Sequence, residues 1–360
     1  MSRQKSLRVN FLLPYEMNLP VGGYKVVYQY SNELVARGHD IRVILPKNLE
    51  PRTDVSGEIK NLIWPRVHKL RNPKGITWFP LDPRVQIVLA ADLREKWLPE
   101  ADFSIATFWK TAPFAHGYSE RMGKKVYLIQ HLETWAGPEA DVVNTWKLPL
   151  KKIVIAKWLA SFADSLGEKC TYIPNGIDFN EYGVDVPIDK RSRRIAMMYN
   201  PDFIKGAWDG INALELIHEK YPDVTVVLFG VAARPFMLPL WIQYVQNATA
   251  PQLREIYNSC SIFAHPSWTE GWPLPPAEAM TCGAAIVAAA NGGVMDYLTA
   301  DETALTSRPK YWLEFADRIA EFLDDDEKRI RFATKGSQTI RGYTYKRATD
   351  SLENLLLELT

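Results

Sequence analysis

Residues 265–298 read HPSWTEGWPLPPAEAMTCGAAIVAAANGGVMDYL. An apolar run, SIFAHP, leads into this stretch at residues 261–266. A second apolar run, AAIVAA, lies within the stretch at residues 284–289. Pro275 and Pro276 lie between the two runs and predict the start of a short helix, since proline is well tolerated in the first helical turn. Strand, helix and strand in such close succession are typical of a parallel sheet covered by helices.

The same alternation continues in both directions from this stretch. Apolar runs predict strands in the first half of the chain at residues 7–14, 39–46, 85–90, 103–109, 125–130, 152–156 and 170–174. Helical periodicity there predicts helices at residues 23–37, 113–122 and 157–166. The pattern restarts with predicted strands at 194–199 and 224–230, and helices at 207–220, 251–259, 275–282, 292–298, 310–323, 326–340 and 346–359.

Two domains are expected from this organisation. The segment at residues 174–194 is rich in Pro, Gly and charge, which is typical of a boundary, and 360 residues suit two domains. We therefore predict an α/β protein with two Rossmann-like domains that face each other across a cleft, divided into residues 1–174 and 175–345. Ligands of such sheets bind beyond the carboxyl ends of the strands.

The charge distribution narrows the possible partners. The chain has 43 Lys plus Arg and 42 Asp plus Glu, a net charge of +1. Residues 1–170 hold 25 basic and 17 acidic residues, a charge of +8, and the remainder carries −7. No nucleic-acid recognition motif accompanies the basic half, so we expect no nucleic-acid partner.

The compartment follows from cysteine usage and from the amino terminus. Cys170, Cys260 and Cys282 are odd in number and far apart, which favours a reducing compartment. Neither a signal peptide nor an apolar stretch of membrane-spanning length is predicted. We expect a cytoplasmic protein.

Two carboxylates in the opening stretch are placed so that both can reach one ligand. Glu270 follows the strand and its loop, and Glu278 lies eight positions later in the predicted helix. Paired carboxylates accept hydrogen bonds from hydroxyl groups at two points of one ligand. The N–H groups of Gly271, Trp272 and Leu274 near the helix start suit a diphosphate, whereas Pro273 has no N–H to donate.

The stretch strongly resembles the signature of retaining glycosyltransferases of family 4, which have the two-domain GT-B fold. The matching positions are Pro266, Ser267, Glu270, Gly271, Glu278, Ala279, Met280, Gly283, Gly292 and Gly293. Further matches are the Gly-Gly turn at residues 22–23, the segment PNGID at residues 174–178 and Lys205-Gly206. The resemblance implies that the helix at residues 346–360 returns to the first domain, and that the donor is a nucleoside-diphosphate sugar.

The resemblance also implies roles for individual residues. Glu270 would lie against the donor sugar, Glu278 would accept from the ribose, and the backbone around Ala248 would contact the base. Lys205 matches the family lysine that neutralises the diphosphate, whose developing charge needs cations and N–H dipoles. The alternatives are ordinary surface carboxylates for the two glutamates and a solvated lysine at a helix start for Lys205.

One departure from the family lies just before that lysine. An arginine normally stands at the strand end, where this chain has Met198, Tyr199 and Asn200. Arg234, in the loop after the strand at residues 224–230, is a candidate replacement, and Tyr199 and Asn200 are weaker ones. An absent phosphate clamp also fits a non-catalytic protein that activates a sister transferase.

In the first domain, Gly22, Gly23 and His131 are the candidate residues. The glycines let backbone N–H groups approach an anion at a helix start, unless they form only a plain turn. His131 follows the strand at residues 125–130 and matches the family histidine beside the anomeric carbon; the alternative is a histidine satisfied in the core. Glu133 and Trp135, in the same loop, would either contact sugar or pack within the loop.

The expected reaction is transfer of a sugar, with retained configuration, to a saccharide or lipid-linked saccharide in cell-surface polysaccharide or glycan synthesis. No Asp-x-Asp motif follows a strand, so we predict no metal and no cofactor. An ion-pair route in which the leaving phosphate takes the acceptor proton is favoured over a covalent intermediate on Glu270. A sugar phosphorylase or epimerase of the same fold is the alternative.

A basic face is the last prediction. Its residues are Arg66, Lys69, Arg71, Lys74, Lys147, Lys151, Lys152 and Lys157. We expect this face to meet an anionic acceptor or an anionic membrane; the alternative is attraction to the protein's own acidic domain.

Overall fold

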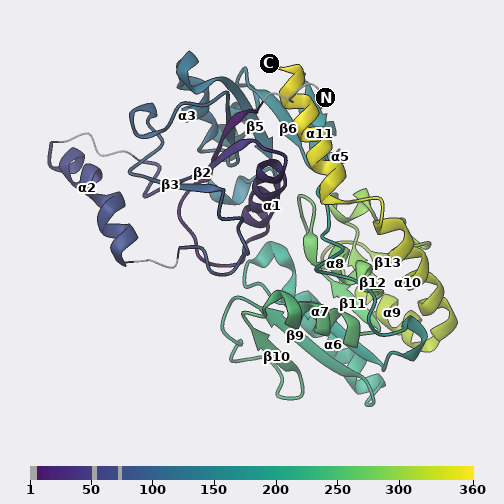
Figure 1. Ribbon diagram of the computed structural model, residues 1–360. Coiled ribbons are helices and arrows are strands. Elements are labelled where there is room, and N and C mark those ends of the chain that lie inside the picture. Colours follow the sequence, from purple (N-terminus) through teal and green to yellow (C-terminus); the bar gives the residue numbers. More distant parts are fainter. Residues whose placement is uncertain (1–5, 51–54, 72–74) are drawn as a thin grey trace. The chain divides into compact units, whose positions relative to one another are not determined.

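The computed structural model describes residues 6–50, 55–71 and 75–360 (Figure 1). The chain forms two compact units, one of Met1–Asn175 with Tyr345–Thr360 and one of Gly176–Thr344. Each unit has its own parallel sheet with helices packed against it. The predicted α/β class with two Rossmann-like domains is therefore confirmed.

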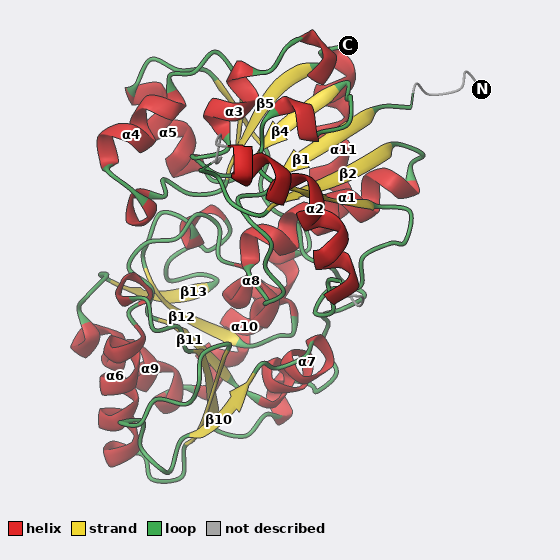
Figure 2. Ribbon diagram, turned by 90° about the vertical axis from the view of Figure 1, so that its left-hand side faces the viewer, coloured by secondary structure: helices red, strands yellow, loops and turns green. Residues whose placement is uncertain are grey.

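The first unit contains a seven-stranded sheet in the order β3-β2-β1-β4-β5-β6-β7. The strands are β1 Arg8–Leu12, β2 Asp40–Pro46, β3 Gln86–Ala90, β4 Phe103–Ala106, β5 Lys124–Ile129, β6 Lys151–Val154 and β7 Cys170–Tyr172. All neighbouring strands pair in parallel, as Figure 2 shows for the strands near β1. The strand order reverses between β1 and β4, which is where sheets of this kind bind ligands.

The carboxyl-terminal helix belongs to the first unit. The helices of this unit are α1 Gly22–Ala36, α2 Val55–Arg71, α3 Ala112–Gly117, α4 Glu139–Trp146, α5 Lys157–Ser165 and α11 Tyr345–Glu358. Helix α11 packs on α1. Glu353 accepts hydrogen bonds from Arg37 at 2.6 Å and from the His39 ring at 2.8 Å, so a buried ionic contact joins the two ends of the chain. The predicted return of this helix is confirmed.

The second unit contains a six-stranded parallel sheet in the order β10-β9-β8-β11-β12-β13. The strands are β8 Arg194–Met198, β9 Thr225–Gly230, β10 Gln243–Gln246, β11 Ile262–His265, β12 Ala285–Ala289 and β13 Ala304–Ser307. The helices are α6 Ala207–Lys220, α7 Ala250–Ser259, α8 Leu274–Thr281, α9 Trp312–Asp324 and α10 Asp326–Ile340. Helix α6 packs on α9 and α8 packs on α10, and the strand order reverses between β8 and β11.

Two predicted helices are shorter in the structure than expected. The helix predicted at residues 292–298 is only a short 3₁₀ turn, Val294–Asp296, because Oδ1 of Asn291 accepts from the N–H groups of Gly293 and Val294 and holds a turn. The helix predicted at residues 113–122 ends at Gly117.

Among the α-helices and strands of the described residues, four were not predicted: α2, α4, β10 and β13. The two strands lie at the edges of their sheet and have four residues each, too few for a clear pattern. Helix α2 was missed because it carries an internal Pro65 and because its apolar residues do not face inward. None of the helices that the structure describes is both long and apolar enough to cross a bilayer.

Candidate active site

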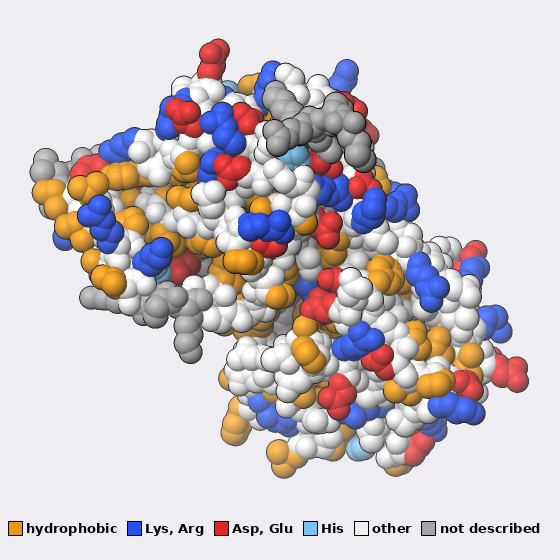
Figure 3. Space-filling view, viewed as in Figure 1, with side chains coloured by type: hydrophobic (Ala, Val, Ile, Leu, Met, Phe, Trp, Pro, Cys, Tyr) orange, Lys and Arg blue, Asp and Glu red, His pale blue; other side chains and the backbone are white. Residues whose placement is uncertain are grey.

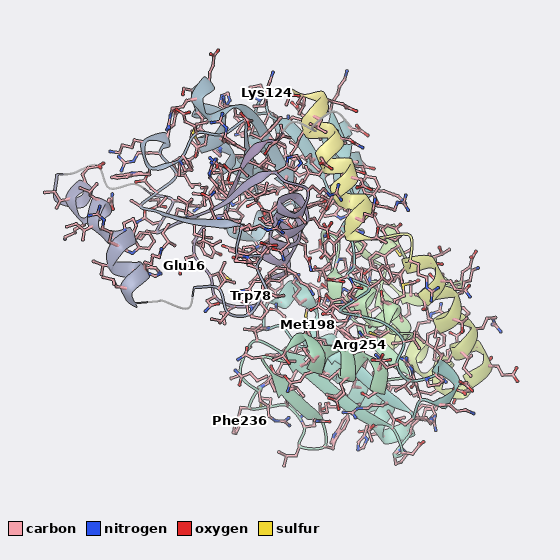
Figure 4. The ribbon with its side chains drawn as sticks, in the orientation of Figure 1. Glu16, Trp78, Lys124, Met198, Phe236 and Arg254 are labelled. Atoms are coloured by element: carbon pink, nitrogen blue, oxygen red, sulfur yellow. The ribbon has the colours of Figure 1, made fainter. Side chains whose placement is uncertain are left out.

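The donor-site residues predicted in the second unit gather at the switch point of its sheet. Strands β8 and β11 are neighbours although two other strands lie between them in sequence. Tyr199 and Asn200 follow β8, where Figure 4 labels Met198, and His265 ends β11. The carboxyl ends of parallel strands share one edge, so residues far apart in sequence meet there.

Lys205 and Glu270 form an ion pair at this edge. The Lys205 Nζ lies 2.8 Å from Oε2 of Glu270. Glu270 is only 8% exposed. Burial pushes the pKa of the Glu270 carboxyl upward, but the Lys205 ammonium, together with His265 and Ser267, more than offsets this and holds the pKa below its usual range. The carboxylate is therefore ionised at neutral pH.

His265 lies on the other side of the same carboxylate. Its Nε2 is 3.9 Å from Oε1 of Glu270, and the side chain is buried. Burial lowers the pKa of the His265 ring to about 4, so the ring is neutral at pH 7. In the part of the chain that the structure describes, this Nε2 has no hydrogen-bond partner. Sequence reasoning did not select His265, although its place at a strand end was a usable signal.

Two glycines allow the backbone to close around this pair. A Cβ on Gly206 would lie 2.3 Å from the carbonyl oxygen of Pro266, and Gly206 has a left-handed φ of +58°. A Cβ on Gly293 would lie 2.6 Å from the carbonyl oxygen of Gly271 and 2.7 Å from that of Glu270. Any larger residue would push the Glu270 segment out of position.

An aromatic cluster braces the loop between Glu270 and α8. The Trp272 ring is buried against Tyr297 and Tyr343, with ring centroids 4.6 and 5.7 Å away. The Tyr297 hydroxyl donates to the carbonyl oxygen of Pro273 at 2.9 Å. Leu274 then begins α8, so the loop enters a helix amino terminus, where backbone N–H groups favour anions.

Glu278 lies one turn into α8 and is buried. Its Oε2 accepts a hydrogen bond from the Tyr257 hydroxyl of α7 at 3.0 Å. This bond fixes one carboxylate oxygen from a neighbouring helix. The carboxylate is thus a positioned acceptor at the base of the same helix, and not a surface charge.

The residues proposed to replace the family arginine have local partners. The Arg234 guanidinium donates to the carbonyl oxygens of Leu238, Pro239 and Ile242 at 2.8–3.2 Å. Oδ1 of Asn200 accepts from the N–H of Asp202 and closes a turn. In this structure Arg234 therefore organises its own loop, and its role as a phosphate clamp stays a prediction.

Tyr199 and Ala248 flank that loop. The Tyr199 ring is buried edge-to-face on Tyr244, 6.1 Å between centroids. Ala248 follows Asn247, whose N–H donates to the carbonyl oxygen of Gly230 and whose φ is +52°. The backbone at Ala248 therefore leaves the end of β10 and is held beside the end of β9, the strand that neighbours β8.

In the first unit, Gly22 and Gly23 begin α1. No side chain caps this helix start. The side-chain amide of Gln130 donates to the carbonyl oxygen of Gly23 at 3.2 Å and ties it to the end of β5. His131 follows directly after Gln130, so the two predicted parts of this site lie at one sheet edge.

His131 is held by its own loop and by two indole rings. Its Nδ1 accepts from the N–H of Leu132 at 2.8 Å, which places the proton of the neutral ring on Nε2. Trp135 and Trp158 lie edge-to-face with the imidazole, with centroids 4.4 and 5.6 Å away. The ring orientation is therefore set by packing on both sides.

Glu133 is a buried carboxyl and not a surface sugar contact. Its Oε2 accepts from the N–H of Trp109 at 2.8 Å, and its backbone has a left-handed φ of +55°. Burial raises the pKa of Glu133 to about 8, against the smaller opposing effect of the Trp109 hydrogen bond. Of the two alternatives, packing within the loop describes Glu133, while Trp135 is half exposed.

A hollow of about 550 Å³ opens in the first unit at the carboxyl ends of β1, β2 and β4. Pro14, Tyr15, Lys47, Asn48, Leu49, Glu50, Phe108, Lys110 and Ala136 line it. Its lining includes two lysines, one glutamate and two aromatic residues, so basic side chains outnumber acidic ones, which suits an anionic saccharide. Sequence reasoning missed Lys47 and Lys110, which follow β2 and β4 as ordinary loop residues.

The predicted basic face is only partly present. Lys152 is buried, and its ammonium binds Glu168 at 2.9 Å and the carbonyl oxygen of Leu148 at 2.8 Å. Its inclusion was wrong, because the strand turns this side chain inward. Lys74 lies outside the described residues, as does the side chain of Arg71.

Known proteins resemble this chain over part of its sequence. Residues 180–339 match the family model described as "Glycosyl transferases group 1". The D-inositol 3-phosphate glycosyltransferase of Corynebacterium efficiens is 31% identical over 145 residues, which are 39% of this chain and 32% of that protein. A Campylobacter jejuni N,N'-diacetylbacillosaminyl-diphospho-undecaprenol alpha-1,3-N-acetylgalactosaminyltransferase is 29% identical over 89 residues, which are 25% of this chain and 24% of that protein.

Structural similarity extends over nearly the whole chain. The crystal structure of Anabaena HepE in complex with UDP and glucose matches with a TM-score of 0.74 at 17% identity, covering 98% of this chain and 100% of that one. The fold is thus that of GT-B glycosyltransferases, and residues 180–339, which hold the Lys205–Glu270 pair, match the glycosyl transferases group 1 family.

Proposed function

We propose that this protein is a retaining, metal-independent glycosyltransferase that moves a sugar from a nucleoside diphosphate to a saccharide or lipid-linked saccharide. The observation that carries the proposal is the ion pair between partly exposed Lys205 and the buried carboxylate of Glu270, with neutral His265 beside it. A lysine and a helix amino terminus within one loop cluster suit a diphosphate, and an ionised carboxylate suits the hydroxyls of the sugar.

The reaction divides between the leaving group and the acceptor. The bond from the anomeric carbon to the diphosphate oxygen breaks, and its electron pair goes to the diphosphate. Lys205 and the N–H groups at the start of α8 stabilise that charge, so the chain supplies cations where a metal would otherwise act. The acceptor oxygen bonds to the same face of the anomeric carbon, and its proton passes to the leaving phosphate.

For the acceptor, we propose the hollow lined by Lys47 and Lys110. Ammonium groups there favour an acceptor that carries phosphate or carboxylate. The names of two relatives support this class, since one acts on an inositol phosphate and the other on a diphospho-undecaprenol carrier. With such an acceptor, the protein would act in cell-surface glycan synthesis, at the inner face of the cytoplasmic membrane.

The test begins with donors alone. UDP-, GDP- and dTDP-sugars are screened by thermal shift, and donor hydrolysis is followed for wild type, Glu270→Gln and Glu278→Gln. Glu219→Gln, an exposed carboxyl on α6, is the matched control. We expect one nucleotide class to raise the melting temperature, and Glu270→Gln to lose turnover at least 100-fold while Glu219→Gln keeps it.

Further measurements separate the finer claims. Turnover that persists in EDTA supports metal independence, and the anomeric proton of the product by NMR reports retention. Lys47→Gln with Lys110→Gln should raise the KM of a phosphorylated acceptor and leave donor KM unchanged. No turnover with any donor, with wild type matching Glu270→Gln, would instead identify a non-catalytic partner, and a trapped glycosyl adduct on Glu270 would establish the covalent route.

A further inference from the structure

Helix α2 turns an apolar stripe to the outside of the first unit. Its exposed apolar residues are Ile59, Leu62, Ile63 and Leu70, and the last is 82% exposed. At 100° per residue these four project from one side of the helix. A surface helix normally turns its apolar side toward the core, whereas α2 turns its apolar side outward. Figure 3 shows orange and blue side chains gathered over this helix.

Polar contacts hold one flank and the opposite side of α2 against the unit. Glu58 accepts from Arg94 at 2.6 Å and from Lys96 at 2.8 Å. His68, one turn before the helix end, pairs with Glu16 at 2.6 Å, and Glu16 is labelled beside α2 in Figure 4. These contacts set the rotation of the helix, so the outward direction of the stripe is built into the fold.

The charge on α2 has one sign on its outer side. Lys60, Arg66 and Lys69 are exposed around the apolar stripe. Glu58 is the acidic residue of the helix, and its charge is paired with Arg94 and Lys96. Within the described residues the three basic side chains form no ion pair. Apolar side chains flanked by cations are the composition that binds at the interface of anionic lipid bilayers.

We propose that α2 docks this protein on an anionic membrane, with Leu62, Ile63 and Leu70 entering the headgroup region and Lys60, Arg66 and Lys69 contacting lipid phosphates. A second copy of the chain is disfavoured as the occupant, because pairing two such stripes would bring like charges together. Docking goes beyond the proposed transfer and does not depend on it. Docking through α2 would bring the proposed acceptor hollow close to the membrane, because Glu16, which pairs with His68 of α2, follows Tyr15, which lines the hollow.

The second unit supplies a matched control surface. The loop after β9 exposes Phe236 and Leu240, which are 100% and 96% exposed, and Phe236 points away from the unit in Figure 4. Arg234, the basic residue of that loop, is engaged with backbone carbonyl groups. This loop is therefore as apolar as α2 but lacks free cations, so the proposal predicts that it does not bind lipid.

The test is co-flotation of the whole protein with vesicles of phosphatidylcholine alone or with about 30% phosphatidylglycerol. Wild type should float with the anionic vesicles only, and less so in 0.5 M salt. Leu62→Ser with Ile63→Ser should weaken partition at least about tenfold. Lys60→Gln, Arg66→Gln and Lys69→Gln together should weaken it on the order of 100-fold.

Two control variants decide the result. Phe236→Ser with Leu240→Ser removes exposed apolar surface elsewhere, and Lys124→Gln, Lys169→Gln and Lys346→Gln remove three exposed charges of the first unit that lie outside the predicted basic face. Both should float like wild type, and all variants should melt at the wild-type temperature. Equal flotation of the α2 variants, equal loss in the controls, or no anionic preference would each overturn the proposal.

Sedimentation separates self-association from lipid binding. If Leu62→Ser with Ile63→Ser converts a dimer to a monomer and leaves flotation unchanged, the stripe is a contact between copies and the membrane proposal fails. Donor turnover without vesicles is measured in parallel. Loss of flotation with normal donor turnover supports docking, and absence of turnover with normal flotation contradicts only the proposed transfer.

Discussion

The ammonium of Lys205 lies 2.8 Å from Oε2 of Glu270, although 65 residues separate them in sequence. Both residues come from loops at the carboxyl edge of one parallel sheet. The pair keeps a buried carboxylate ionised. We therefore expect removal of either partner to change the stability of the fold and, under the proposed function, to weaken donor binding.

Lys205→Met should leave Glu270 buried without its cation. Breaking a buried pair costs roughly 3–5 kcal/mol, and because Lys205 is partly exposed we expect about 2–3 kcal/mol. Urea denaturation measures this loss. Adding Glu270→Gln should restore part of it, since the double variant has no uncompensated charge. A double variant less stable than Lys205→Met would show that the pair is not the source of the loss.

His265→Asn should change how stability depends on pH. The unfolded ring binds a proton near pH 6.5, whereas the folded ring has a pKa of about 4, so wild type loses stability as the pH falls through this range. Between pH 6.5 and 4.5, the free energy of unfolding of the variant should fall less than that of wild type, by up to about 2–3 kcal/mol. We compare urea midpoints of both proteins at pH 6.5 and 4.5. Parallel curves for the two proteins would contradict the prediction.

Glu133→Gln should have the opposite pH signature. The folded carboxyl has a pKa of about 8 against its usual 4.5, so the unfolded state releases a proton that the folded state keeps. Wild-type stability from this group therefore falls as the pH rises from 4.5 to 8. The variant should gain a few kcal/mol relative to wild type between pH 5 and pH 8. Glu139→Gln, an exposed carboxyl on α4, is the control and should show no such gain.

Gly293→Ala should disturb the Glu270 loop through a direct clash. The new Cβ would lie within 2.7 Å of two backbone oxygens, while the backbone φ of −73° is ordinary, so the effect comes from space and not from strain. We expect a loss of about 1–3 kcal/mol and at least a tenfold fall in donor turnover. Gly117→Ala has no atom within 4 Å of its Cβ and should be neutral in both assays.

The sequence predicted the elements whose signal is local. Apolar runs marked the seven strands of the first sheet and four of the second, and the Glu270 to Glu278 spacing marked a loop and helix that the structure contains. It could not predict β10 or β13, because a four-residue edge strand has too few positions to show a period. It also missed α2, because an outward apolar stripe contradicts the rule used to find helices.

Sequence alone thus determined the α/β class and the residues that belong to strand ends, since alternation and motif spacing are properties of neighbouring residues. Only the tertiary structure decided which strand ends meet. It placed Lys205 and His265 on either side of Glu270, directed the Glu133 carboxyl inward, engaged Arg234 with its own loop, and turned α2 outward. Strand order and burial set these contacts, and both depend on the packing of residues far apart in the chain.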